Sequence, residues 1–150
     1  VALFDVSDVK NPQEISKVII GDRGTNSELL SNHKALLFSR EKQLLAFPVT
    51  VMKIRESDKK AASGWPAYGS FEYQGAYIYQ IDLKKGLQFK GRITHLSQED
   101  LLKAGDNWYD TEKNIDRIIY IGNNLYTLSP SQIQANAWNS LKLTGTLEIN

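Results

Sequence analysis

The chain has 150 residues, of which 41% are hydrophobic and 23% are charged, and this is enough material to bury the core of one domain. Its formal charge of +1 at pH 7 gives no indication of a nucleic-acid partner, and no apolar run approaches the ~18 to 20 residues that span a bilayer. The absence of Cys excludes disulfides, thiolate zinc sites and Cys nucleophiles, and the only histidines, His33 and His95, lack metal-ligand spacing, so we expect no metal or cofactor.

The first predicted element is a strand over residues 1–6, which are apolar and favour β structure. Because the chain begins inside a strand, without a start Met or a flexible lead-in, we expect it to be an excerpt of a longer protein or a processed product. A segment rich in turn-forming residues over 7–12 precedes a second predicted strand over 14–20. Residues 1–20 therefore predict a hairpin.

Two apolar runs, 34–38 and 44–51, flank a short polar turn and predict a second hairpin. Both runs are apolar on both faces, which is typical of strands buried between two layers. Pro48 predicts a bulge or the end of the strand, because proline cannot donate a ladder hydrogen bond. Residues 52–75 form a predicted insertion, charged in its first half and aromatic in its second.

A third hairpin is predicted over 76–82 and 87–94. A second insertion, residues 97–115, follows it. Within that insertion Ser97 and Asp100 have the spacing of a capping box and predict one short helix, which Gly105 can end.

The last two predicted hairpins lie near the end of the chain. Residues 117–121 and 125–129 flank a turn rich in Gly and Asn, and they are followed by strands over 133–138 and 141–149. The sequence thus predicts an all-β chain of ten strands with one short helix.

Three of the strands resemble copies of one unit, in which an apolar strand ends in Asp or Asn and a turn follows. They cover residues 2–8, 77–82 and 133–139. When the two insertions are set aside, their spacings bracket the ~40 to 45 residues of a four-stranded propeller blade. We therefore predict a β-propeller fragment of about two and a half antiparallel blades: an outer hairpin over 1–20, a full blade over 34–95 and a full blade over 116–150.

Several motifs are similar to those of a known family. The opening residues 2–8, together with Asn11 and Pro12, resemble the repeat of Leu-Val-Ile-Val-Asp type in bacterial and archaeal envelope propellers. Residues 20–25, 33–38, 74–79 and 120–122 resemble the C-terminal part of secreted bacterial proteins that carry a C-terminal β-propeller domain. This resemblance implies a propeller in an extracellular or envelope-associated protein, and it assigns neither an activity nor catalytic residues.

Aromatic residues are concentrated between positions 65 and 79, in and after the first insertion. Six of the fifteen aromatic residues of the chain lie there: Trp65, Tyr68, Phe71, Tyr73, Tyr77 and Tyr79. Rings exposed on a loop at one face of a propeller can stack on a sugar, a peptide or a polymer, which makes the first four candidate ligand-binding residues. Alternatively the last two belong to a strand, and the others hold a long loop against the blade.

A second candidate cluster lies in the connection between the first hairpin and the first full blade. It consists of Asp22, Arg23, Glu28 and His33, with Lys34 beside them. Such connections line the rim of the central channel, where propellers often bind ligands, and a His beside a carboxylate can act as a base while an Arg binds an anion. Alternatively these charged groups tie the connection together by hydrogen bonds, since no nucleophile motif accompanies them.

Two classes of function follow from these observations. The first is a non-catalytic binding or scaffold module of a secreted or envelope-associated bacterial protein, with a protein or glycan ligand. The second is an extracellular hydrolase or lyase that acts on a polymer, for which the glycosidase form needs two carboxylates ~5 to 10 Å apart. Because ten strands do not close a ring, we expect the chain either to self-associate through its open blade edges or to form an open arc.

Overall fold

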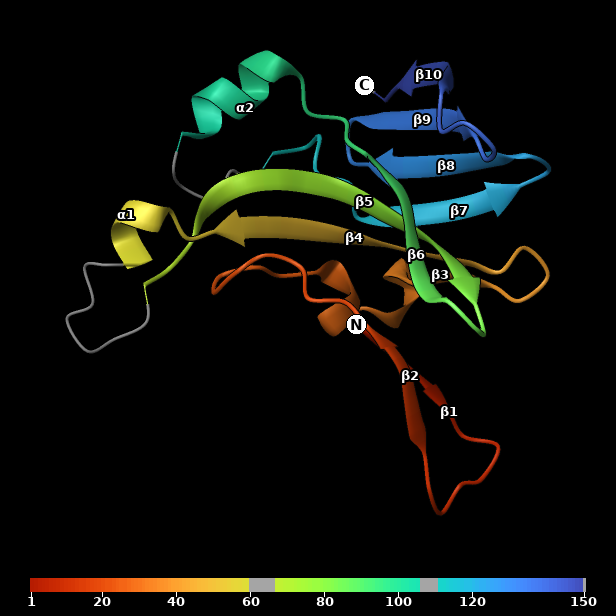
Figure 1. Ribbon diagram of the computed structural model, residues 1–150. Helices are drawn as coiled ribbons and strands as arrows, with labels where there is room; N and C mark the ends of the chain where they lie inside the picture. The colour runs from red at the N-terminus through yellow and green to blue at the C-terminus, as the bar shows by residue number, and fades with distance from the viewer. Residues whose placement is uncertain (60–66, 106–110, 150) are drawn as a thin grey trace.

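The computed structural model describes residues 1–59, 67–105 and 111–149, and Figure 1 shows how their elements are arranged. The described part contains ten strands, as predicted: β1 (Ala2–Asp5), β2 (Gln13–Lys17), β3 (Leu37–Ser39), β4 (Leu44–Lys53), β5 (Ser70–Asp82), β6 (Gly86–Ile93), β7 (Arg117–Ile121), β8 (Asn124–Ser129), β9 (Gln132–Ala137) and β10 (Leu143–Glu148). Short helices occupy some of the connections: α1 (Glu56–Lys59), α2 (Gln98–Ala104) and the 3-10 turns η1 (Glu28–Leu30) and η2 (His33–Ala35).

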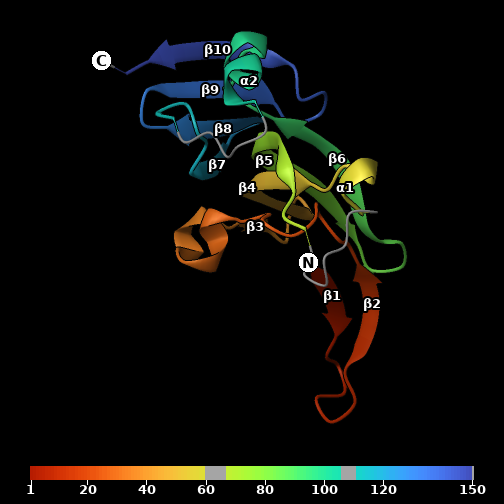
Figure 2. The ribbon, with the colours of Figure 1, turned by 90° about the vertical axis from the view of Figure 1, so that its left-hand side faces the viewer.

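The strands form two four-stranded antiparallel sheets and one separate hairpin. The sheets contain β3 to β6 and β7 to β10, each in chain order, and β1 pairs with β2. Figures 1 and 2 show the sheet β7–β10 on one side of the sheet β3–β6 and the hairpin β1–β2 on its other side. The predicted fold class, two and a half antiparallel blades, is confirmed.

The central sheet β3–β6 is buried on both faces. One face of β4 and β5, including Leu44 and Ile78, packs with Ile118 and Leu125 of the neighbouring sheet. The opposite face packs with side chains of the hairpin and of the segment that follows it. That second cluster contains Phe47, Val49, Val51, Tyr73, Tyr79 and Leu87, with Leu3, Val18 and Ile20 against them. The apolar character of both faces of residues 44–51 therefore reflects burial between two layers, as predicted.

The strand predicted over residues 34–38 is shorter in the structure. β3 begins only at Leu37, because His33–Ala35 form the turn η2. The side chain of Asn32 accepts a hydrogen bond from the backbone N–H of Lys34, at 3.1 Å. An Asn that bonds the backbone two residues later competes with strand pairing, and this local bond sets the start of the strand.

Pro48 lies inside β4, where it pairs with Ala76, so the predicted bulge or strand end at this position is wrong. The irregularity in the register lies after Val51 instead. Thr50 exchanges two backbone hydrogen bonds with Asn26, on the side away from β5. Residues two apart in a strand direct their backbone groups to the same edge. The nitrogen of Pro48 therefore faces an edge that β3 does not reach, and no ladder bond is lost.

The insertion predicted over 52–75 is also shorter, because both flanking strands extend into it. Lys53 pairs with Ser70, which leaves only residues 54–69 between β4 and β5. The helix α1 lies in this connection and adds to the one helix that the sequence predicted.

The predicted helix in the second insertion is confirmed as α2. Its N-cap is Ser97, whose side chain accepts from the N–H of Asp100 while the Asp100 carboxylate accepts from the N–H of Ser97. Gly105 follows the last helical residue with a positive φ of 57°. Reciprocal capping of this kind satisfies two backbone donors that a helix start leaves without partners.

Candidate functional site

The four aromatic residues predicted as a ligand-binding patch do not form one exposed surface. Trp65 lies outside the described residues. Tyr68 is exposed, and the Arg23 guanidinium lies over its ring, 4.1 Å from the centroid. Phe71 and Tyr73 lie within β5 rather than in a loop, and Tyr73 is only 5% exposed. The extension of β5 by pairing with β4 therefore places these two rings in the sheet.

The charged cluster predicted at the rim is divided among different elements. The Asp22 backbone N–H donates to the carbonyl of Met52, and the Asp22 carboxylate accepts from the N–H of Ile54, both at the end of β4. His33 belongs to η2 and is exposed. Only Glu28 of this cluster lines a cavity that also contains residues of the next blade. Asp22 thus holds this connection in place by hydrogen bonds, which is the alternative role that the sequence left open.

The cavity that contains Glu28 has a volume of about 290 Å³. Its walls come from residues 26–28, from residues 48–50 of β4, from Gln74 of β5 and from residues 111–116, which lead into β7. The cavity therefore lies between the connection that leads into β3 and the connection that leads into β7, the innermost strands of the two blades. A volume of this size is at the lower end of the range for small-molecule sites.

Hydrogen bonds hold the walls of the cavity in place. Gln74, which is 3% exposed, donates through Nε2 to the carbonyl of Ile115 at 2.8 Å and accepts through Oε1 from the Ile115 N–H at 3.0 Å. On the other wall Asn26 and Thr50 exchange backbone hydrogen bonds, and the Ser27 hydroxyl donates to the carbonyl of Pro48. The cavity thus has a frame fixed by bonds to the central sheet, which favours a preformed site.

Two carboxylates, Glu28 and Asp116, line this cavity from different blades. Both residues are exposed, and the pKa of Asp116 is raised, mainly by partial desolvation and less by the negative charge of Glu28, while the positive charge of Arg117 opposes the shift. A cation bound near these groups would counteract the effect of Glu28, because an opposite charge favours the ionised form of a carboxyl. Two acidic side chains thus lie on the lining of this cavity.

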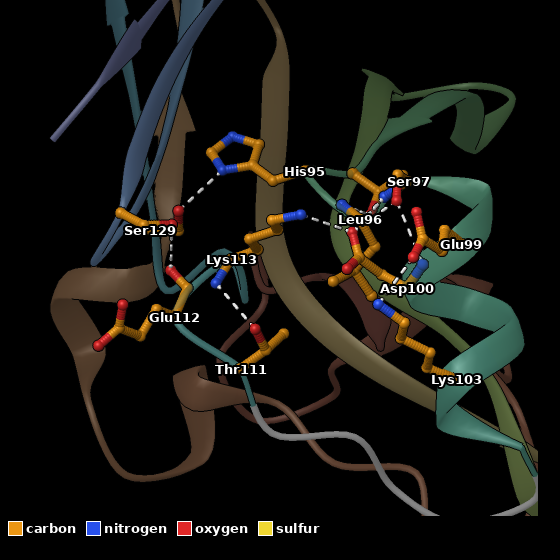
Figure 3. Close-up of polar contacts among 12 residues, drawn as sticks. His95, Leu96, Ser97, Glu99, Asp100, Lys103, Thr111, Glu112, Lys113 and Ser129 are labelled. Carbon is orange, nitrogen blue, oxygen red and sulfur yellow. Dashed lines mark hydrogen bonds and ion pairs between the residues drawn. The ribbon is translucent and has the colours of Figure 1, made fainter. Parts of the chain in front are cut away.

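Hydrogen bonds of His95 form a second polar contact between the sheets, and Figure 3 shows part of it. His95 does not line the cavity. Its Nδ1 lies 3.0 Å from the Ser129 hydroxyl, and its Nε2 lies 2.8 Å from the Thr127 hydroxyl. Ser129 donates to the carbonyl of Gln132, so its oxygen accepts from Nδ1–H, and Nε2 accepts from Thr127. Burial lowers the pKa of His95 to about 4, which keeps the ring neutral.

This Ser–His contact does not have the arrangement of a catalytic pair. A nucleophilic Ser donates its proton to the ring, whereas Ser129 donates to a backbone carbonyl. The second ring nitrogen of His95 faces a hydroxyl rather than an orienting carboxylate, and all three side chains are buried. The hydrogen bonds of His95 are therefore structural and hold the segment after β6 against β8.

Figure 3 also shows the ion pair that attaches α2 to the connection before β7. The Lys113 ammonium lies 2.8 Å from the Asp100 carboxylate, which also accepts from the hydroxyl of Ser97. These bonds lower the pKa of Asp100 to about 2, the bond from Lys113 having the largest effect. The carboxylate that caps α2 thus also anchors one of the segments that form the cavity.

Sequence reasoning identified Glu28 but missed Asp116 and Gln74. Asp116 directly precedes β7, whereas Glu28 lies on η1 and is separated from β3 by η2. The two carboxylates therefore do not occupy equivalent positions of the repeat, so the repeat could not indicate that they line one cavity. Gln74 gave no indication either, because a single Gln within an apolar strand has no distinctive pattern.

The described residues contain no cluster of three or more His, Cys, Asp or Glu side chains that could hold a metal ion. Among those same residues, no helix is both long enough and apolar enough to cross a membrane.

Comparison with known proteins gives one match. A family model described as "Beta propeller domain" matches residues 1–141. No curated protein and no solved structure matches the chain.

Proposed function

Because this chain belongs to the β-propeller domain family, whose fold generally suggests a binding or scaffold module, we propose that it is a non-catalytic binding module with its ligand site between two blades. The observation that carries this proposal is the pair of carboxylates, Glu28 and Asp116, in one cavity. The frame of this cavity is fixed by hydrogen bonds to the central sheet.

The chemistry of the cavity favours a ligand that carries a protonated amine. Glu28 and Asp116 both line the cavity, and a bound ammonium group could form charge-assisted hydrogen bonds with these carboxylates. A Lys side chain of a protein ligand and an amino sugar of a glycan ligand both carry such a group. Both belong to the ligand classes that we propose for this module.

We expect Glu28→Gln and Asp116→Asn each to weaken amine binding about tenfold, because each removes one charge-assisted contact. The measurement is calorimetric titration of the full chain with glucosamine and with Nα-acetyl-lysine methylamide. The neutral analogue N-acetylglucosamine should bind less tightly than glucosamine. Glu14→Gln, which neutralises an exposed carboxylate on β2, is the matched control and should leave the affinity unchanged. Equal affinity for the neutral and the charged sugar would contradict the assignment.

A polymer hydrolase or lyase is the second candidate, and the same two carboxylates favour it. Such an enzyme needs one carboxyl as general acid and a second as its partner base, and two carboxylates line this one cavity. In this version Glu28 and Asp116 replace Asp22 and His33, since the Asp22 carboxylate accepts from the N–H of Ile54 and His33 lies on η2. Release of new reducing ends from a polysaccharide, lost in Glu28→Gln, would establish the enzyme and refute the non-catalytic module.

We further propose that the module works outside the cell or at the cell envelope. The support is the resemblance of residues 20–25, 33–38, 74–79 and 120–122 to secreted bacterial proteins with a C-terminal propeller. Detection of the protein in the culture medium or the envelope fraction of its source would test this location.

Self-association is the remaining part of the proposal. Ile119, Ile121 and Leu147 border an apolar groove of about 380 Å³ on the sheet β7–β10, and the hairpin exposes Val1 and Phe4. Exposed apolar side chains gathered on a sheet face favour contact with a second copy. Light scattering should show a mass that increases with concentration, and replacing Ile121 with Lys should reduce it. A constant monomer mass at millimolar concentration would refute this expectation.

A further inference from the structure

A groove of about 340 Å³ lies on the outer part of the central blade, away from the cavity between the blades. One wall is the segment over residues 18–21, which follows β2, and the other is the face that β5 and β6 direct toward the hairpin. The Ser16 hydroxyl accepts a hydrogen bond from the N–H of Leu87 at 3.2 Å and holds β2 beside β6. The spatial relation of β2 and β6 can be followed in Figure 2.

The floor of this groove is aromatic, and part of it is open to solvent. Phe89 is 56% exposed, although its ring contacts Tyr77 at 5.4 Å and Tyr79 at 5.5 Å between centroids. The angles between the ring planes are 57° and 65°, so these contacts are tilted or edge-on. The two Tyr rings thus fix the orientation of Phe89 while more than half of the Phe89 side chain remains available to a ligand.

The aromatic series continues below the surface and makes the floor rigid. Tyr73 contacts Tyr77 at 5.6 Å, and Phe47 stacks with Tyr79 at 6.1 Å with an interplanar angle of 10°. Phe47, Tyr73 and Tyr79 are all at most 5% exposed. An exposed ring on a buried aromatic base is pre-organised for binding, because little conformational freedom remains to be lost.

Charged side chains of both signs surround the aromatic floor. Lys53, Glu72 and Arg92 are exposed and line the same groove. The Arg92 guanidinium lies 4.4 Å from the centroid of the Tyr73 ring, and this cation–π contact positions the side chain without an anionic protein partner. The groove therefore offers an apolar floor with hydrogen-bond donors and an acceptor at its margin.

We propose that this groove is a second binding site and that it binds an oligosaccharide of β-linked pyranoses with equatorial substituents. Such a sugar presents a flat face of C–H groups that fits on an exposed ring, and hydroxyl groups at its edge that reach charged side chains. The arrangement of ring floor and polar margin in this groove matches both surfaces. The site is independent of the amine site, because the groove and the cavity share no lining residue.

The proposal is tested by calorimetric titration of the full chain with cellopentaose and with chitopentaose. Phe89→Ala should weaken the binding of the preferred sugar at least tenfold, because it removes the exposed part of the floor. Glu72→Gln should weaken binding by a smaller factor of about three to ten, because it removes a charged acceptor but keeps the shape. Phe38→Ala is the matched control, since Phe38 is 58% exposed on a different strand and does not line the groove.

Binding that Phe89→Ala abolishes and Phe38→Ala leaves unchanged supports the site. The free energy of unfolding of both variants, measured in parallel, shows whether either substitution acts through stability. The proposal is overturned if the wild-type chain binds neither pentasaccharide at millimolar concentration. It is equally overturned if both Phe variants lose affinity to the same extent, or if the groove binds only an apolar peptide.

Discussion

Replacing Ile78 with Ala is expected to lower the free energy of unfolding by about 3 to 4 kcal/mol. Ile78 is fully buried in β5, in the cluster that joins the two sheets, and strands pair with β5 on both sides. A strand fixed by two ladders cannot move to fill the space left by the lost carbons. The cost therefore includes both the lost burial and an unfilled cavity. Urea unfolding followed by Trp fluorescence gives the free energy directly.

The control for this prediction is Ile121→Ala, because Ile121 is the same residue type but is 59% exposed on β7. It should cost less than about 1 kcal/mol, since few contacts are lost at an exposed position. Equal effects of the two substitutions would show that the interface between the sheets does not stabilise the chain. An Ile78→Ala cost below about 1 kcal/mol would lead to the same conclusion.

The second large effect concerns His95 and pH. The pKa of His95 is about 4 in the folded chain because of burial, against about 6.5 in an unfolded one. Between these values the unfolded chain binds a proton that the folded chain does not bind, so stability is lost as the pH falls from about 6.5 to about 4. One pKa unit corresponds to about 1.4 kcal/mol, so the expected loss over this range is on the order of 3 kcal/mol.

The His95→Ala variant should lack this part of the pH dependence. It should also be less stable at pH 7 by about 2 to 4 kcal/mol, because the buried hydroxyls of Thr127 and Ser129 each lose a hydrogen-bond partner. His33→Ala, at an exposed position, is the control and should retain the wild-type dependence. The measurement is the free energy of unfolding at several pH values. Identical pH profiles for the wild-type chain and His95→Ala would disprove the assignment of the neutral ring.

The elements of this fold that depend on local patterns were predictable from the sequence. The repeated unit was expected to end in Asp or Asn before a turn, and the carboxylates of Asp5, Asp8 and Asp82 accept backbone N–H groups two or three residues later. The capping box of Ser97 and Asp100 likewise depends only on a spacing of three residues. Local hydrogen bonds need no information about the rest of the chain.

The features that depend on the stacking of the sheets were not predictable in this way. Glu28 and Asp116 are far apart in the sequence, and they line one cavity only because the connections before β3 and β7 lie together. Pro48 is tolerated inside β4 because its nitrogen faces an edge that β3 does not reach. Tyr73 was assigned to a loop because the sequence could not show that β4 and β5 continue to pair beyond that proline.

The attachment of residues 26–28 to β4 has a consequence for the motions of the candidate site. An isolated bridge between Asn26 and Thr50 and the Ser27 side-chain bond connect this wall to the strand, whereas the opposite wall is joined through the buried Gln74. The first wall can therefore open in brief local fluctuations only when these bonds to β4 break, while the sheet itself stays folded. Hydrogen exchange at the amides of Asn26 and Thr50 should then slow when an amine occupies the cavity, and those two amides would report occupancy residue by residue.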